Sequence, residues 1–517
     1  MQQKACDKGL FGPVTAVPKQ IVDAPVLLSR KAIKGVMDCF GLLMPIELAV
    51  QGCLQRNPSL SLLTPDVMNC GAELESLLSE VAPAEFIHRS SERNPTILPN
   101  DSLLSLPWRL KSEVRKRPIP VGRPAVLRHT NAHSILTLLR ESGSCSRADL
   151  VRATGLSAPT VTNVVKDLLS KGLVEPLGEG ESRGGRPPDN FRFKAERGCV
   201  LAVEISAHSI TFLLTDLNGN QLDTLRIPIT KRKTTPSAVC RYINEGLQRL
   251  LHKNKTTRKQ LLAMVVGVPA IANVEDGSVL SISTMEGWRA VPLRAMLNKI
   301  VNCLVIIEND TNLAAKGEHY CGAAQAEQDL VLIDIGTNVS AGIVLGGRIH
   351  HGSQWSAGEI AYLRLPHVTR RTPTIHEFGE LEAVVTNSGI MKSWLSSDRR
   401  TAPGRRRNGK GLDAFEILNL AQTGDARAQA IVQLRANIIS DIVVNLSLIL
   451  NPALILLSGE IGSHPALIMS VLKQLEASEF AIPKIGTGSL GPAAVLWGAV
   501  SLALDAISSV LLPKPPN

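Results

Sequence analysis

The sequence predicts an α/β protein that carries a winged helix-turn-helix in its N-terminal half. Two observations predict this class. Three short, capped helix patterns followed by a hairpin pattern occupy residues 121–197, and buried apolar strands alternate with helices from residue 198 to the end. At 517 residues the chain is long enough for two or three domains. We predict an N-terminal extension at 1–120, poorly patterned and poorly ordered, a DNA-binding domain at 121–197 and an α/β domain at 198–517.

Composition narrows the class of protein. The net charge is +10, and residues 115–197 hold 15 Lys and Arg against 8 Asp and Glu. A local basic excess of this size favours a polyanionic partner, although a solvated basic surface is the alternative. The nine cysteines form no C-x-x-C pair, which is typical of free thiols in a reducing cytoplasm. The chain shows no uninterrupted apolar run of about 18 residues and no signal-peptide pattern, so we expect a cytoplasmic protein without a membrane partner.

The helix patterns of residues 121–197 are bounded by recognisable caps. Ser146 is a natural N-cap for "RADLVRATG", which stops at Gly155. Ser157 caps the next helix, "APTVTNVVKDLLSKG", whose early proline costs no hydrogen bond, and Gly172 ends it. A tight turn between these two helices, followed by a hairpin with a glycine-rich tip, predicts a winged helix-turn-helix.

The third helix would enter the major groove with its N-terminal residues. Asn pairs with adenine, short hydroxyl side chains suit base edges or phosphates, and arginines on a glycine-rich wing suit the minor groove. The alternative is a three-helix packing module with a solvated hairpin. The predicted DNA contacts are Ser157, Ala158, Thr160, Thr162, Asn163 and Lys166 on the helix, and Arg183 and Arg186 in the wing segment "RGGRPP".

The remaining chain alternates strands and helices. "CVLAVEISAHSITFLLTDLNGNQL" predicts a hairpin, and "LLAMVVGVPA", "CLVIIEND" and "ALILLSGEIG" predict buried strands. "DIGTNVSAGIVLGG" predicts a strand pair joined by a tight turn. Helices are expected near 236–252, 413–422 and 425–450, and in the closing segment "GPAAVLWGAVSLALDAI". Polar residues at the ends of buried strands are typical of a ligand cleft.

From about residue 121 onward the chain resembles the ROK family, a group of sugar kinases and sugar-responsive repressors. The order and spacing of several segments carry this resemblance: "SRADLVRATGLSAPTVTNVVKDLLSKGLVE", "GGRPP", "ENDTNLAAKGE", "DIGTNVSAGIVLGGRIHHG", "SAGEIAY", "GELEAVVTNSGI" and "NPALILLSGEIG". The resemblance implies a two-lobed, actin-like and hexokinase-like (ribonuclease H-like) fold around a cleft. The helix-turn-helix resembles the repressor branch.

The resemblance also implies a sugar site. The family's Asn-Asp pair matches Asn309 and Asp310, and Asp310 is the position of the catalytic base in a kinase. The same two residues could instead only cap the following helix. Further sugar contacts match Glu359 and Glu382, since carboxylates are good acceptors for sugar hydroxyls. Tyr362 stands where the family has a histidine that touches sugar and zinc.

The family's ATP and zinc motifs are altered. "EISAHS" (204–209) stands in place of D-I-G-G-T-K, "TNVSAG" replaces T-G-x-G-A-G, and "SGE" (458–460) replaces a triple glycine. Backbone must approach phosphate closely, so side chains at Ser206, Ala207 and Ser340 weigh against ATP binding. The zinc stretch reads "PTIHEFGELE", with His376 and no cysteine. We expect no metal, no cofactor and no catalytic residue.

The sequence therefore predicts a transcriptional regulator of the repressor type that binds operator DNA as a homo-oligomer, a dimer or tetramer. A sugar or sugar derivative in the cleft would control it without phosphoryl transfer. The main alternative is a sugar kinase with a DNA-binding head, and the presence of Asp310 at the position of the catalytic base favours it. A third possibility is an architectural DNA-binding regulator without a ligand.

Overall fold

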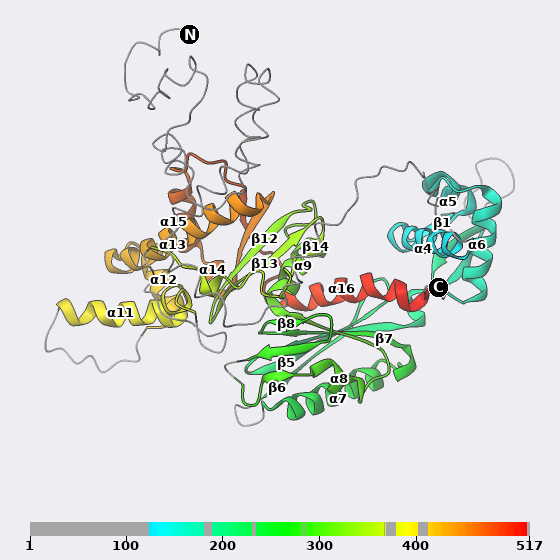
Figure 1. Cartoon of the computed structure of the whole chain (residues 1–517), viewed down its shortest axis with the longest axis horizontal. Helices are drawn as coiled ribbons and strands as arrows, with labels where there is room; N and C mark the ends of the chain where they lie inside the picture. Colours follow the sequence, from blue (N-terminus) through cyan, green and yellow to red (C-terminus); the bar gives the residue numbers. More distant parts are fainter. Residues whose placement is uncertain are drawn as a thin grey trace, which may run out of the picture. The chain divides into compact units, whose positions relative to one another are not determined.

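The computed structural model describes residues 124–179, 189–229, 234–282, 285–366, 368, 379–401 and 412–513. These residues belong to one compact unit, which contains a helical head and two sheets of five strands (Figure 1). The predicted N-terminal extension at 1–120 and the wing residues Arg183 and Arg186 lie outside the described residues, as does His376.

The head is a winged helix-turn-helix. Ser146 caps the second helix through a capping box, in which its hydroxyl accepts from Asp149 N at 3.2 Å and Asp149 accepts from Ser146 N at 3.0 Å. Gly155 ends this helix in the left-handed conformation, as predicted. The elements are α4 (Pro124–Ser142), β1 (Ser144–Ser146), α5 (Arg147–Thr154), α6 (Ala158–Ser170), β2 (Val174–Glu179) and β3 (Asp189–Phe193), with strand order β1-β3-β2.

The two larger sheets repeat one topology. In each sheet, the first three strands along the chain pair antiparallel. The fourth strand then pairs in parallel with the first, and the fifth pairs in parallel with the fourth. The first sheet, ordered β11-β7-β4-β5-β6, contains β4 (Cys199–Ile205), β5 (Ser209–Asp216), β6 (Gln221–Pro228), β7 (Leu261–Val268) and β11 (Leu304–Asn309). The second, ordered β14-β13-β12-β15-β16, contains β12 (Leu330–Ile335), β13 (Val339–Leu345), β14 (Arg348–Ile349), β15 (Leu454–Ser458) and β16 (Lys484–Thr487). "CVLAVEISAHSITFLLTDLNGNQL" thus forms three strands rather than one hairpin, because both of its polar interruptions are turns.

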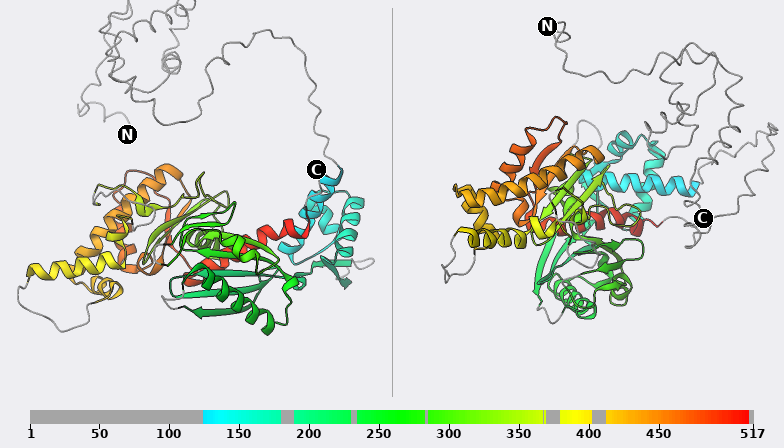
Figure 2. Two further views of the ribbon diagram at one scale, coloured as in Figure 1. Left: turned by 60° about the horizontal axis from the view of Figure 1, so that its bottom comes forward. Right: turned by 60° about the vertical axis from the view of Figure 1, so that its left-hand side comes forward.

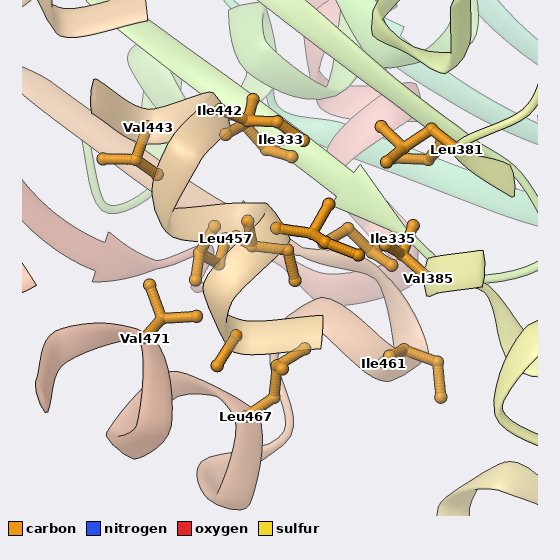
Figure 3. Packing of buried hydrophobic residues seen from close by; sticks show 14 of the residues in the cluster. Ile333, Ile335, Leu381, Val385, Ile442, Val443, Leu457, Ile461, Leu467 and Val471 are labelled. Carbon is orange, nitrogen blue, oxygen red and sulfur yellow. The ribbon is translucent and has the colours of Figure 1, made fainter. Parts of the chain in front are cut away.

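Helices cover both sheets (Figure 2). The first lobe adds a small sheet of β8 (Ala272–Asn273), β9 (Ser278–Ser281) and β10 (Arg289–Val291), with helices α7 (Pro236–Lys253) and α8 (Leu293–Asn298). The second lobe adds α10 (Glu382–Val385), α11 (Asn387–Thr401), α12 (Ala414–Gln422), α13 (Ala426–Leu450), α14 (Gly459–Gly462) and α15 (Pro465–Leu475). Its core is aliphatic, as the low aromatic content requires: Ile333, Leu457, Ile442 and Val471 are all almost fully buried (Figure 3).

Two helices, α9 (Asp310–Cys321) and α16 (Ala494–Leu511), lie against each other between the sheets. Their backbones meet at glycines, since a Cβ on Gly317 would collide with the carbonyl oxygen of Ala494, and one on Gly498 with that of Leu313. Lys316 of α9 is also ion-paired with Asp505 of α16 at 3.2 Å. The helices α13 and α16 are long and apolar enough to cross a membrane, but 61% and 56% of their apolar windows are buried inside the protein. Both are therefore explained as core helices.

Helix α16 also contacts the head. His129 Nε2 donates to the carbonyl oxygen of Leu512 at 2.7 Å, and Arg140 donates to that of Leu504 at 3.3 Å. The Arg140 guanidinium also lies 5.8 Å from the ring centroid of Phe193 in β3. Helix α16 thus contacts both the head and the interior of the α/β domain.

Candidate functional site

A cavity of about 370 Å³ opens between the two lobes. It is lined by the ends of β11 and β12, the β4–β5 and β12–β13 turns, and the segments that precede α9 and α10. All five residues predicted to bind ligand line it, although they come from three separate stretches of sequence: Asn309, Asp310, Glu359, Tyr362 and Glu382. Whether they bind a ligand stays a prediction.

Asn309 and Asp310 lie where β11 passes into α9. The Asn309 side chain accepts from Asn312 N at 3.0 Å and so caps α9, while its amide nitrogen donates to Ala270 O at 3.2 Å. Asn309 is therefore a helix cap that also faces the cavity. The Asp310 carboxylate accepts from Thr311 N at 2.8 Å. Desolvation, followed by the neighbouring carboxylates of Asp334 and Glu204, raises the pKa of Asp310 to about 8.

The carboxylates of Glu359 and Glu382 form a second acidic pair. Burial, then the charge of Glu382, raises the pKa of Glu359 to about 7. Burial also raises the pKa of Glu382, against the effect of two backbone donors, Gly379 N at 2.8 Å and Val339 N at 3.4 Å. Tyr362 ends a single 3₁₀ turn, Ile360–Tyr362, directly after Glu359. These groups can donate and accept hydrogen bonds to a polyhydroxylated ligand.

A buried carboxylate behind the cavity was missed by sequence reasoning. Glu308, 2% exposed, accepts from Asn309 N at 2.8 Å and from Asn312 Nδ2 at 3.0 Å. His351 Nε2 lies 2.7 Å from Glu308, and this contact raises the pKa of the imidazole. Glu308 thereby fixes the start of α9 against the loop after β14. An acidic residue inside the apolar strand "LVIIEND" was the available signal.

Three backbone donors of the β4–β5 turn are bonded within the turn itself. The Ser206 hydroxyl accepts from His208 N at 3.4 Å and from Ser209 N at 3.2 Å, and Ser206 N donates to Ser209 O at 2.9 Å. Ser206, Ala207 and His208 all line the cavity. Backbone N–H groups of a turn that binds phosphate must point freely at the ligand.

The β12–β13 turn carries side chains into the same cavity. The hydroxyls of Ser340 and Thr311 are 2.6 Å apart, so a hydrogen bond joins β13 to the first turn of α9. Asn338 and Ser340 have negative φ, and neither takes the left-handed conformation. The exposed Glu460 carboxylate accepts from Asn387 Nδ2 at 3.1 Å and does not line the cavity.

No three His, Cys, Asp or Glu side chains within the described ranges are grouped as metal ligands. The stretch around His376, where a zinc site would be sought, lies outside those ranges. The absence of a metal stays a prediction.

The head presents the other candidate surface. Ser157, Ala158, Thr162, Asn163 and Lys166 are exposed on α6. Thr160 is half-buried, and its hydroxyl lies 2.8 Å from that of Ser157, which caps the helix. The opposite face of α6 is core, with Val161, Val164, Val165 and Leu168 buried. The surface available to DNA is confirmed as exposed, whereas DNA contact by these residues stays a prediction.

The chain combines a winged helix-turn-helix with a two-lobed α/β domain that has a polar cavity between its lobes. These features define a DNA-binding transcriptional regulator built on a kinase-like fold. The model of the ROK family matches residues 200–506, and that of the MarR family matches residues 129–185. The chain belongs to the ROK family.

Similar proteins agree with this class. A xylose repressor of Caldicellulosiruptor bescii is 22% identical over 397 residues, which cover 74% of this chain and 98% of the relative. A glucokinase of Halalkalibacterium halodurans is 26% identical, covering 56% of this chain and 88% of the enzyme. The crystal structure of a ROK family transcriptional regulator, a homologue of the E. coli MLC protein, matches with a TM-score of 0.64 at 22% identity, covering 75% of this chain and 98% of that one. The predicted family, fold class and regulatory role are confirmed.

Proposed function

We propose that the protein represses transcription from operator DNA until a sugar or sugar derivative binds in the interlobe cavity. The observation that carries the proposal is the convergence of Asn309, Asp310, Glu359, Tyr362 and Glu382 on one cavity, in a chain that also carries a DNA-binding head. Carboxylate and amide oxygens accept hydrogen bonds from vicinal sugar hydroxyls. In a half-buried site, where water competes less, each such hydrogen bond contributes more to ligand affinity. Such a regulator acts in the cytoplasm, where operator DNA is available.

We further infer that the cavity does not transfer a phosphoryl group. The Ser206 hydroxyl occupies two backbone donors of the β4–β5 turn, those of His208 and Ser209, and the Ser340–Thr311 hydrogen bond lies in the β12–β13 region where phosphate would have to approach. Asp310, with a pKa of about 8, retains the position of a general base. The kinase alternative therefore rests on Asp310, and the two turns weigh against it.

Helices α9 and α16 provide a route from ligand to DNA. Asn309 caps α9 and Asp310 begins it, and the backbone of this helix touches α16 at Gly317 and Gly498. The C-terminal end of α16 is hydrogen-bonded to α4 of the head. Movement of α9 on ligand binding would thus displace the head and change the spacing between the two heads of a homodimer on a palindromic operator.

The test is a titration of operator binding with sugars. DNA fragments selected by the purified full chain are labelled, and anisotropy reports the operator affinity as each sugar is added. We expect one sugar class to weaken operator binding by about tenfold or more, a typical coupling. Glu359→Gln should abolish the response, whereas Glu460→Gln, an exposed carboxylate outside the cavity, should leave it unchanged. A response absent for every sugar contradicts sensing, and robust sugar-dependent ADP release from ATP contradicts the non-enzymatic role.

A further inference from the structure

The charges that line the cavity are all of one sign. Asp310, Asp334, Glu359 and Glu382 contribute carboxyl groups to its wall, and Glu204 acts on Asp310 from β4. Among the described residues that line it there is no lysine or arginine, and His208 is the one imidazole. Arg226 acts on Glu204 from β6 and is not part of the wall. An anion in this cavity would face several carboxyl groups, and no lysine or arginine in the described part of the wall would compensate them.

The neutral polar groups of the wall also favour an uncharged ligand. Asn309, Thr337, Asn338, Ser340 and Tyr362 offer amide and hydroxyl groups, which donate and accept in turn. A sugar hydroxyl also both donates and accepts hydrogen bonds, so each of these protein groups can pair with one. A phosphate needs several donors together, but the Ser206 hydroxyl already accepts from His208 N and Ser209 N, and the Ser340 hydroxyl is hydrogen-bonded to Thr311.

We propose that the cavity selects sugars that carry no phosphate or other anionic group, and that it discriminates against the phosphate ester of the sugar it binds. This inference rests on the proposed sensing function and names the ligand class of the same site. At separations of about 6 Å and an effective dielectric constant near 20, one carboxylate weakens the binding of a phosphate charge on the order of 100-fold. Burial raises the pKa of all four carboxyl groups of the wall and so reduces their ionised fraction at neutral pH, while the backbone donors Gly379 N and Val339 N favour the ionised form of Glu382.

The experiment compares each sugar with its own phosphate ester. Isothermal titration calorimetry of the full chain uses aldopentoses, aldohexoses and N-acetylhexosamines, each paired with its terminal phosphate. At least one neutral sugar should bind, with its phosphate ester at least tenfold weaker. A phosphate ester that binds tighter, or less than tenfold weaker, overturns the proposal and leaves sensing intact. Binding by neither member of any pair defeats the sensing function itself.

A charge variant separates electrostatics from a simple lack of room. Asp334→Asn keeps the shape of the side chain and removes one charge from the wall. The ratio of the two dissociation constants should fall by roughly tenfold if charge sets the preference, less than the 100-fold of a full charge because burial raises the pKa of Asp334. An unchanged ratio in a variant with wild-type circular dichroism overturns the electrostatic explanation. Higher salt should likewise narrow the difference, because screening weakens repulsion but not hydroxyl recognition.

Discussion

Replacing Asp310 by asparagine should stabilise the protein while it weakens ligand binding. The carboxylate faces the cavity beside Asp334 and Glu204, and its pKa rises from an ordinary 3.8 to about 8. Between these two pH values the folded state holds a proton that the unfolded state releases, so the stability of the wild type falls as pH rises through this window. The substituted side chain would keep an acceptor for Thr311 N and would carry no charge.

The size of the effect follows from the pH. pH 7 lies about three units above the ordinary pKa of an aspartate, so the raised pKa of Asp310 destabilises the folded wild type at this pH by at most about 4 kcal/mol. Asp310 is not fully buried, and screening by water in the cavity reduces this to about 1–2 kcal/mol. The advantage of Asp310→Asn should therefore be small at pH 5 and grow toward pH 8.

Thermal unfolding of both proteins between pH 5 and pH 9 measures this difference. Asp167→Asn is the matched control, because Asp167 is exposed on α6 and only pairs with Lys171 at the surface. Parallel pH profiles for wild type and Asp310→Asn would refute the argument, since they would mean that Asp310 is ionised in the folded protein at no cost.

Four further predictions concern the DNA head and its connection to the cavity. Gly498→Val should destabilise the protein by about 1–3 kcal/mol in urea unfolding and blunt the sugar response of operator binding, because the new side chain collides with Leu313 O. Arg140→Ala should preserve operator affinity in anisotropy but reduce its response to sugar, because it removes a hydrogen bond to α16. Lys166→Ala should weaken binding to all sequences and lower the salt slope by about one, whereas Asn163→Ala should cost about 1–3 kcal/mol and relax specificity at one base position in a selection experiment.

Matched variants define what would contradict these predictions. Ser509→Ala, on the exposed end of α16, should change neither stability nor response. A wild-type response in folded Gly498→Val would exclude the packing of α9 on α16 as the connection, and one in Arg140→Ala would leave the His129–Leu512 hydrogen bond as the contact between α16 and the head. A sequence-dependent loss in Lys166→Ala would place that side chain on a base rather than a phosphate.

The sequence was informative wherever structure depends on neighbours in the chain. Ser146 and Gly155 bound their helix as predicted, because caps act over three or four residues. The family motifs also singled out Asp310 and Glu359, which line one cavity in the structure.

Features that depend on distant contacts were not accessible in the same way. The Glu308–His351 pair joins residues 43 positions apart, and only the fold brings them to 2.7 Å. The hydrogen bond between Ser340 and Thr311 is of the same kind. Glycine at 498 has no local signature, since its reason is the backbone of another helix.

Two residues of the cavity wall, Asn309 and Glu359, differ in the selective pressure that retains them. Asn309 caps α9, so selection for a stable fold would retain it in a descendant that had lost its ligand altogether. Glu359 is the opposite case, because burial raises its pKa to about 7 and makes its charge unfavourable to folding. Across a set of diverging descendants, the persistence of Glu359 is therefore the better sign of a ligand that is still bound, and its replacement by glutamine or an apolar residue would mark the lineages in which sensing has lapsed.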